Sequence, residues 1–233
     1  MPLGGHNGCP MGPCFHDRAD GGRQLALALG HHAGEDDALV LGLPRGGVPV
    51  AREVARHLGA PLDILLVRKL GVPFQPELAL GAIAPGVRVL DRRVVRECGL
   101  GEEEIETVAR AEECELRRRE GLYRGPGPGT APLPPVPRAG RIAIVVDDGL
   151  ATGSSMRAAV AVLRQSDARA VVVGVPVAAA ETCERLRPSV DELVCLATPS
   201  PFRAVGLWYE DFSEVSDEEV RSALLEGRRA SQS

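Results

Sequence analysis

Two adjacent aspartates and a hydroxyl-rich turn lie close together in the second half of the chain. Asp147 and Asp148 follow an apolar run at residues 142–146, and the sequence Thr-Gly-Ser-Ser begins four residues after the second aspartate. Ionised carboxylates accept hydrogen bonds and so suit the paired hydroxyls of a sugar. A helix that starts at the turn presents unpaired amides at its positive end, and Gly153 lets the backbone approach a phosphate closely. The spacing indicates a site for a phosphorylated sugar, although a capped helix beside a solvated aspartate pair would share part of the pattern.

Two other segments carry groups that suit anions. The sequence PRGG at residues 44–47 lies between an apolar run and a helical pattern. Its glycines allow successive amides to face one anion, while Arg45 supplies positive charge. A strand expected at 62–67 ends in Arg68 and Lys69, and Lys69 is the one lysine among 27 basic residues. A simple strand-to-helix turn and a surface lysine are the alternative interpretations of these two segments.

In this order, the three segments resemble landmarks of the type I phosphoribosyltransferases (PRTases), enzymes that use 5-phosphoribosyl-1-pyrophosphate (PRPP). Residues 141–160 resemble the thirteen-residue PRPP-binding signature of the family, and its core here is VVDDGLATGSS. Residues 39–50 resemble the loop that holds pyrophosphate. Residues 65–71 and the stretch 71–77 resemble a strand ending in Arg-Lys and a mobile loop that closes over the substrate. The resemblance extends over residues 17–226.

The resemblance implies a pentosyltransferase, a glycosyltransferase of nucleotide and nucleoside metabolism that works with Mg²⁺. A nitrogen nucleophile would displace pyrophosphate from C1 of PRPP through an oxocarbenium-like transition state, and Mg²⁺ would arrive with PRPP. Catalysis would be largely electrostatic. The implied roles are catalysis by Arg45, Arg68 and Lys69; binding of pyrophosphate by Arg45, Gly46 and Gly47; binding of the ribose, with any protein contact to Mg²⁺, by Asp147 and Asp148; and binding of the 5′-phosphate by Ala151, Thr152, Gly153, Ser154 and Ser155.

The acceptor is less well defined. Family members that use 6-oxopurines carry an aspartate just before the Thr-Gly pair, whereas this chain has Ala151, so hypoxanthine and guanine are less expected. Four of the seven aromatic residues fall within 201–215, a stretch that resembles the segment covering the acceptor in several purine-type members. Trp208 or Phe202 is therefore a candidate for stacking on the base. Packing of the last helix against the sheet is the alternative role of these aromatic residues.

Two functions other than catalysis fit the same site. A PRPP or nucleotide sensor would keep the site without turnover, and an interaction module would act beside another enzyme. The Arg68-Lys69 pair and the expected mobile loop favour the enzyme, because a sensor has no departing pyrophosphate to stabilise. A homodimer is the assembly usual in the family, and residues 102–122 offer a surface for one.

These residues need a scaffold that brings strand ends and helix starts to one edge. Short apolar runs alternate with helical patterns, which predicts an α/β fold. The resemblance specifies it as a type I PRTase-like (Rossmann-like) central parallel sheet flanked by helices, with a small hood or lid. Strands are expected at 38–43, 62–67, 79–84, 87–90, 142–146, 170–175 and 192–196, mostly buried on both faces, and helices at 18–32, 48–58, 102–122, 155–165 and 217–226.

We expect a single domain over residues 17–228, preceded by a flexible tail at 1–16. Residues 125–137 hold six prolines and three glycines and are expected to form a surface loop, since neither a helix nor a central strand tolerates that composition. A split into two domains at this loop is the alternative. The charge-rich helix at 102–119 is expected to be a lid or dimer helix. In the tail, the residues that could ligate a metal match no regular zinc spacing; they are His6, Cys9, Cys14 and His16.

Composition argues against several other classes of protein. A net charge of −5 without a block of like charge disfavours nucleic-acid binding. The longest uncharged apolar stretch, residues 170–180, is too short to cross a membrane, and no secretory signal is found. We therefore expect a cytoplasmic protein with reduced cysteines. The lysine lies outside a GxxxxGK(S/T) loop, and HExxH and GxSxG motifs are absent from the sequence, which argues against P-loop NTPases, zinc proteases and serine hydrolases.

Overall fold

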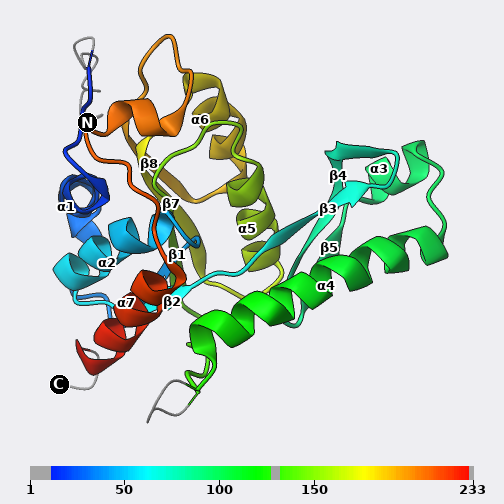
Figure 1. Ribbon diagram of the computed structural model, residues 1–233, viewed down its shortest axis with the longest axis horizontal. Coiled ribbons are helices and arrows are strands. Elements are labelled where there is room, and N and C mark those ends of the chain that lie inside the picture. The colour runs from blue at the N-terminus through cyan, green and yellow to red at the C-terminus, as the bar shows by residue number, and fades with distance from the viewer. Residues whose placement is uncertain (1–11, 127–131, 231–233) are drawn as a thin grey trace.

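A five-stranded parallel sheet forms the centre of the computed structural model, which describes residues 12–126 and 132–230 (Figure 1). The strand order is β2-β1-β6-β7-β8. These strands are runs of Val, Leu and Ile that are largely buried, because helices cover the sheet on either side. Their bounds are β1 (Ala38–Gly42), β2 (Leu62–Ile64), β6 (Ile142–Val146), β7 (Ala170–Val177) and β8 (Glu192–Ala197).

Alternate residues of each strand enter two separate hydrophobic cores. Val40 and Ile144 face one core together with α1, α2 and α7, whereas Leu41 and Val145 face the other with α5 and α6. Side chains of a strand alternate between its two faces, so each apolar run supplies both cores. The predicted α/β fold with a central parallel sheet between helices is confirmed. The helices are α1 (Arg18–Ala28), α2 (Gly47–Leu58), α5 (Ser154–Arg164), α6 (Ala180–Leu186) and α7 (Asp217–Ala230).

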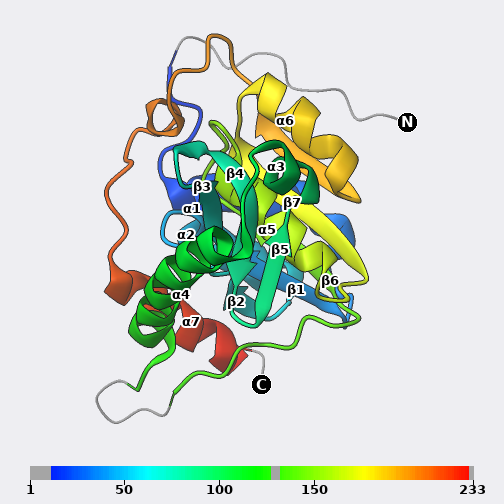
Figure 2. The ribbon, with the colours of Figure 1, turned by 90° about the vertical axis from the view of Figure 1, so that its right-hand side faces the viewer.

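A second, antiparallel sheet forms a hood beside the main body (Figures 1 and 2). It contains β3 (Arg68–Val72), β4 (Gln75–Ala84) and β5 (Val87–Leu90), joined by α3 (Arg92–Glu97) to the long helix α4 (Glu102–Arg124). Ile105, Ala109 and Leu116 form the apolar stripe of α4 that is buried against the hood. The expected hood is thus built from strands that the sequence could not separate from the central sheet. Among the described helices, none combines the length and apolarity needed to cross a membrane.

The start of the hood corrects one prediction about the chain. Arg68 and Lys69 do not end a strand of the central sheet; they open β3, which pairs antiparallel with β4. The apolar run at 62–67 conceals this change, because buried strands of either sheet have the same composition. Residues 71–77, expected to be a mobile loop, form the tip of the β3-β4 hairpin, with Val72 paired to Gln75.

A buried ion pair holds the end of the hood helix to the central sheet. Arg124 lies 2.8 Å from Asp63, whose side chain has no exposed surface. Asp63 also accepts hydrogen bonds of 2.8 Å from the backbone amides of Ile64 and Val136. The pair therefore joins α4, β2 and the last residues of the proline-rich region at 125–137. Within that region, residues 127–131 lie outside the described residues.

The beginning of the described chain is docked rather than free. Phe15 is 4% exposed, pairs with Tyr209 in a β-bridge, and its amide donates to the carbonyl of Trp208. Of the tail expected at residues 1–16, residues 14–16 are held by aromatic packing and backbone hydrogen bonds, and residues 1–11 lie outside the described residues. Cys14 is disulfide-bonded, which corrects the expectation of reduced cysteines at that position, since composition does not reveal which thiols approach each other. The free cysteines of the described chain are Cys98, Cys114, Cys183 and Cys195.

Replacing Asp63 by asparagine should destabilise the protein strongly. The substitution keeps the size of the side chain but leaves Arg124 buried without a counter-charge, which typically costs about 3–5 kcal/mol. Urea denaturation measures the change in the free energy of unfolding. Glu115→Gln is the matched control, because Glu115 pairs with Arg118 and Arg119 on the surface of α4, and it should cost less than about 1 kcal/mol. Equal losses in the two variants would contradict the anchoring role of Asp63.

Candidate functional site

The acidic doublet and the loop at residues 44–47 lie against each other at the carboxyl edge of the central sheet. Strands β1 and β6 are parallel neighbours, so the segments that follow them meet at this edge. A Cβ on Gly46 would lie 2.0 Å from Oδ2 of Asp148, and one on Gly47 would lie 2.6 Å from the carbonyl oxygen of Val146. Gly46 has ordinary helical torsion angles, φ −60° and ψ −34°. The glycines are thus needed because neighbouring atoms approach closely, and not because of the torsion angles of Gly46.

Arg18 holds the second aspartate of the doublet. Its Nε donates a 2.9 Å hydrogen bond to Asp148, and both side chains are largely buried, at 12% and 15% exposure. The guanidinium lies 3.7 Å from the centre of the Phe212 ring, and another of its nitrogens donates to the carbonyl of Ser213 over 2.6 Å. The hydroxyl of Tyr209 donates to the carbonyl oxygen of Asp148, also over 2.6 Å. Segments from both ends of the chain therefore orient this carboxylate.

The doublet resists carrying two negative charges in the ligand-free protein. Burial, followed by the neighbouring charge of Asp148, raises the pKa of Asp147 well above its ordinary value. Burial also raises the pKa of Asp148, against the opposing effect of Arg18. Two such carboxyls release their protons as a coupled pair. A bound cation, or hydroxyls that donate to the carboxylates, would favour full ionisation.

The hydroxyl-rich turn lies open at the start of α5. Gly153 caps the helix with φ +68°, a left-handed conformation that favours glycine, and a Cβ there would lie 2.6 Å from Thr182. Thr182 donates a 2.6 Å hydrogen bond to the carbonyl of Ala151 and so fixes the turn from behind. Ala151, Thr152 and Ser155 are exposed. The positive end of α5 and its unpaired amides therefore face solvent, as an anion site requires.

Arg157 and Arg18 are functional candidates that the sequence analysis missed. Arg157 donates to the carbonyl of Thr152 over 2.7 Å and to the hydroxyl of Ser154 over 3.3 Å, so its charge lies beside the turn. A cation in the first turn of a helix is disfavoured by the helix dipole unless an anion is near, and that position was the signal available in the sequence. Arg18 lies 130 residues from its partner in the chain, and no local pattern indicates the contact.

A cleft of about 490 Å³ between the hood and the main body brings the three predicted segments together. Pro44 lines it from the loop after β1, Arg68 and Lys69 from the hood, and Ser154 and Ser155 from the start of α5. The two aspartates, together with Arg45, Gly46, Gly47 and Thr152, are not among the residues that line this cleft. The carboxylates lie behind the loop that borders it.

Hood carboxylates balance the two basic residues of the cleft. Arg68 donates a 2.5 Å hydrogen bond to Glu112 of α4. The ammonium of Lys69 lies 3.6 Å from Glu77 of β4, and the lysine side chain is 28% exposed. An anion that enters the cleft would thus find two cations already positioned on one strand.

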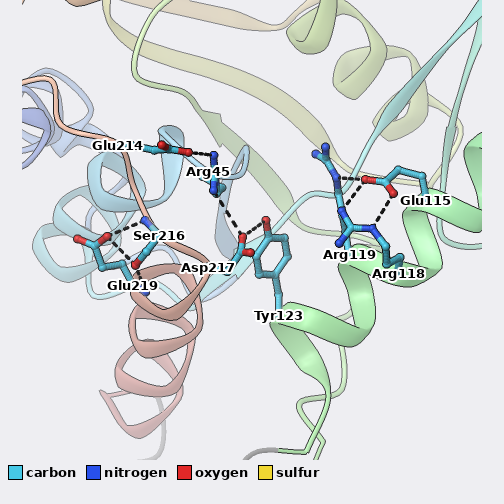
Figure 3. A network of polar contacts seen from close by, with 9 residues as sticks. All are labelled: Arg45, Glu115, Arg118, Arg119, Tyr123, Glu214, Ser216, Asp217 and Glu219. Atoms are coloured by element: carbon cyan, nitrogen blue, oxygen red, sulfur yellow. Dashed lines mark hydrogen bonds and ion pairs between the residues drawn. The ribbon is translucent and has the colours of Figure 1, made fainter.

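Arg45 is directed toward the C-terminal segment, as Figure 3 shows. Its guanidinium contacts Glu214 and lies 4.0 Å from Asp217, the first residue of α7. Asp217 also accepts a 2.9 Å hydrogen bond from Tyr123 at the end of the hood helix. Burial, and then this contact, raises the pKa of Tyr123 to about 12. The arginine expected at the pyrophosphate is therefore already paired with two carboxylates in the ligand-free structure.

The aromatic residues of the C-terminal segment pack elsewhere. Trp208 and Phe202 stack on each other with ring centres 6.5 Å apart, in a cluster that includes Phe15 and Tyr209. Neither lines the cleft between hood and body, and no lining residue of that cleft in the described chain is aromatic. In the ligand-free structure these rings therefore take part in packing, and the expectation that one of them stacks on an acceptor stays a prediction.

Comparisons with known protein families, sequences and structures agree on the family of this chain. The family model described as phosphoribosyl transferase domain matches residues 16–209. Two Mycobacterium tuberculosis proteins, each named "Putative phosphoribosyl transferase" (MT0597 and Rv0571c), are 50% identical over 216 residues, which cover 92% of this chain and 47% of theirs. The chain thus spans about half the length of these curated relatives. The crystal structure of TT1426 from Thermus thermophilus is similar with a TM-score of 0.83 and 46% identity, over 91% of this chain and 98% of that one.

Replacing Asp147 by asparagine should stabilise the ligand-free protein at neutral pH. Because folding raises the pKa of Asp147, its ionisation costs folding free energy above that pKa, and asparagine does not ionise. A gain in the free energy of unfolding is expected at neutral pH and should vanish in acid, where Asp147 is protonated. Unfolding by urea across a pH series measures it.

Asp191→Asn is the matched control of opposite sign. A backbone hydrogen bond from Val171 and the contact with Arg164 lower the pKa of Asp191, so its ionisation supports folding above its unfolded pKa. This variant should lose stability at neutral pH and approach the wild type in acid. An Asp147→Asn protein that behaves like Asp191→Asn would contradict the charge repulsion inferred at the doublet.

Proposed function

We infer that this chain, which belongs to the phosphoribosyl transferase family, transfers the 5-phosphoribosyl group of PRPP to a nitrogenous acceptor and releases pyrophosphate. The observation that carries the proposal is the cleft at which the loop after β1, the basic pair of β3 and the start of α5 meet. PRPP carries a phosphate at one end of its sugar and a pyrophosphate at the other, so a protein that binds it needs a site for the phosphate, one for the pyrophosphate and one for the sugar between them. The curated relatives are about twice as long as this chain, so the activity is proposed for the domain described here.

Each part of the site has a role that its chemistry supports. The amides and hydroxyls of the turn at residues 152–155, whose ends are exposed, suit the 5′-phosphate, and Arg157 lies beside them. The doublet suits the ribose hydroxyls, and Arg18 keeps one of its carboxylates in place. Arg68 and Lys69 would stabilise the charge that develops on the departing pyrophosphate. Holding both ends of PRPP would fix its C1 in the geometry for attack.

The doublet also fits magnesium that enters with PRPP. Mg²⁺ prefers oxygen ligands, keeps several waters, and commonly binds one or two carboxylates together with substrate phosphates. Asp147 and Asp148 are adjacent carboxyls whose pKa values are raised by burial, and a divalent cation beside them would favour their ionised form. When bound, the ion would neutralise part of the pyrophosphate charge. Asp147 and Asp148 are the residues that would contact it.

The acceptor is a nitrogenous base, and the residues that line the cleft do not select one particular base. Ala151 is exposed and provides no carboxylate to accept a proton from a 6-oxopurine. Leu65, Val108 and Leu116 offer an apolar wall, while Arg119 and Glu112 offer one donor and one acceptor group. We therefore place the acceptor between the hood helix and the main body.

A sensor of PRPP or nucleotides that does not turn over is the second candidate. The contact of Arg45 with Glu214 and Asp217 favours it, because an arginine committed to carboxylates is not free to neutralise a leaving group. In the enzyme, pyrophosphate must compete with both carboxylates for this guanidinium. The two candidates therefore differ in turnover and agree in binding PRPP.

Pyrophosphate release separates these functions. The protein is incubated with PRPP, Mg²⁺ and a panel of purine and pyrimidine bases, and both pyrophosphate and the new nucleotide are measured. We expect release with at least one acceptor, and no release from the Asp148→Asn variant. Binding of PRPP without release for every acceptor would contradict the transferase and support the sensor.

Calorimetry with PRPP tests the site itself. Asp148→Asn removes a charged acceptor from the ribose and should abolish measurable binding, a loss of roughly 100-fold or more. Cys114→Ser is the control, because Cys114 is exposed on the hood helix away from the cleft lining, and its affinity should match the wild type. Urea denaturation of both variants checks that they fold. Equal affinities for PRPP in the two variants would contradict the assignment of the doublet.

A further inference from the structure

Two histidines and a glutamate meet at the edge of the central sheet opposite the acidic doublet. His31 and His32 lie in the short 3₁₀ helix η1 (Gly30–His32), directly after α1. Glu192 is the first residue of β8, whereas the doublet follows the last residue of β6. Since these strands are parallel, the two groups lie at opposite ends of the sheet. The cluster therefore has no part in the site described above.

Both imidazoles converge on one carboxylate oxygen. Nε2 of His31 lies 3.1 Å from Oε2 of Glu192, and Nε2 of His32 lies 2.9 Å from the same atom. The three atoms lie within 4.8 Å of one another. Ligands at about 2.0–2.2 Å from a tetrahedral zinc ion are separated by about 3.3 Å, so small side-chain shifts would admit an ion between them.

One buried polar atom of the cluster lacks a hydrogen-bond partner among the described residues, and a metal bound on the other side of the ring would explain its position. His32 is 8% exposed, and its Nδ1 is buried without a hydrogen-bond partner among the described residues. That atom faces Glu35, whose carboxylate oxygen is 3.9 Å away. When a metal takes Nε2 of a histidine, the ring proton is on Nδ1, and a carboxylate beside that nitrogen is its usual partner. Nδ1 of His32 and Glu35 have this arrangement.

We propose that His31, His32 and Glu192 bind a divalent transition-metal ion of the zinc class, with water in the remaining position. Imidazole nitrogens with one carboxylate suit Zn²⁺, Co²⁺ and Ni²⁺, whereas Mg²⁺ prefers oxygen ligands alone. The His31 side chain is 54% exposed, so solvent and ions reach the cluster from that side. The ion would tie the end of α1 to β8, and thus fix the helix whose first residue, Arg18, holds Asp148.

Zinc titration of tag-free protein, freed of metal with a chelator, tests this site. Calorimetry should show that the wild type binds a zinc ion and that His31→Gln binds it at least about 100-fold more weakly. Loss of a residue that only orients a metal ligand typically weakens binding by no more than that, so the larger loss identifies a ligand. His57→Gln is the matched control, because it also removes an exposed histidine but not one of the cluster, and it should bind zinc like the wild type. His31 is exposed, so its replacement should leave the metal-free unfolding temperature unchanged.

A second readout guards against metal bound elsewhere on the chain. Zinc should raise the unfolding temperature of the wild type and of His57→Gln, but not of His31→Gln or Glu192→Gln. Cobalt should produce the visible absorption of a four-coordinate ion in the first two proteins and not in the last two. Zinc affinity in His31→Gln and Glu192→Gln equal to that of the wild type would overturn the proposal. So would the lack of zinc binding by the wild type.

Discussion

The proposed chemistry depends on two carboxyls that the fold keeps at the end of β6 against their electrostatic preference. Burial raises the pKa values of both Asp147 and Asp148, and the charge of Asp148 adds to the rise at Asp147. Arg18 compensates part of that cost, and its own position depends on Phe212 and the carbonyl of Ser213. A site that is costly without ligand is suited to binding a cationic or hydroxyl-bearing one, because the ligand supplies the missing partners. Stability and binding therefore oppose each other at these two residues.

The segment between η3 (Val205–Trp208) and α7 connects the parts of the site that the sheet does not. Tyr209 holds the backbone of the doublet, Glu214 contacts the loop after β1 through Arg45, and Asp217 reaches Tyr123 of the hood helix. The contacts of Glu214 and Asp217 are visible together in Figure 3, where the segment passes Arg45. A change in the position of this segment would thus alter contacts at the doublet, at the loop after β1 and at the hood helix. The aromatic residues concentrated here pack together with Phe15 at the start of the described chain.

The sequence predicted the scaffold well and the relation between distant segments poorly. Continuous apolar runs gave β1 and β6 nearly to the residue, because a strand buried on both faces has few alternatives. The same continuity concealed the point at which the chain passes from the central sheet to the hood before Arg68. Local motifs identified the turn at 152–155, whereas the Arg18 contact depends on tertiary packing that no local pattern encodes. The packing of Trp208 and Phe202 with Phe15 and Tyr209 was not predicted, because aromatic clustering in a sequence does not say which surface the rings cover.

The chain carries a single lysine, and the fold places it on a wall of the cleft with about a quarter of its side chain accessible. Apart from the chain's own α-amino group, reagents that acylate or reductively alkylate primary amines therefore meet one reactive position. A fluorophore or crosslinker can be attached at the mouth of the hood without engineering a cysteine. Occupancy of the cleft could then be followed from the rate of that labelling alone.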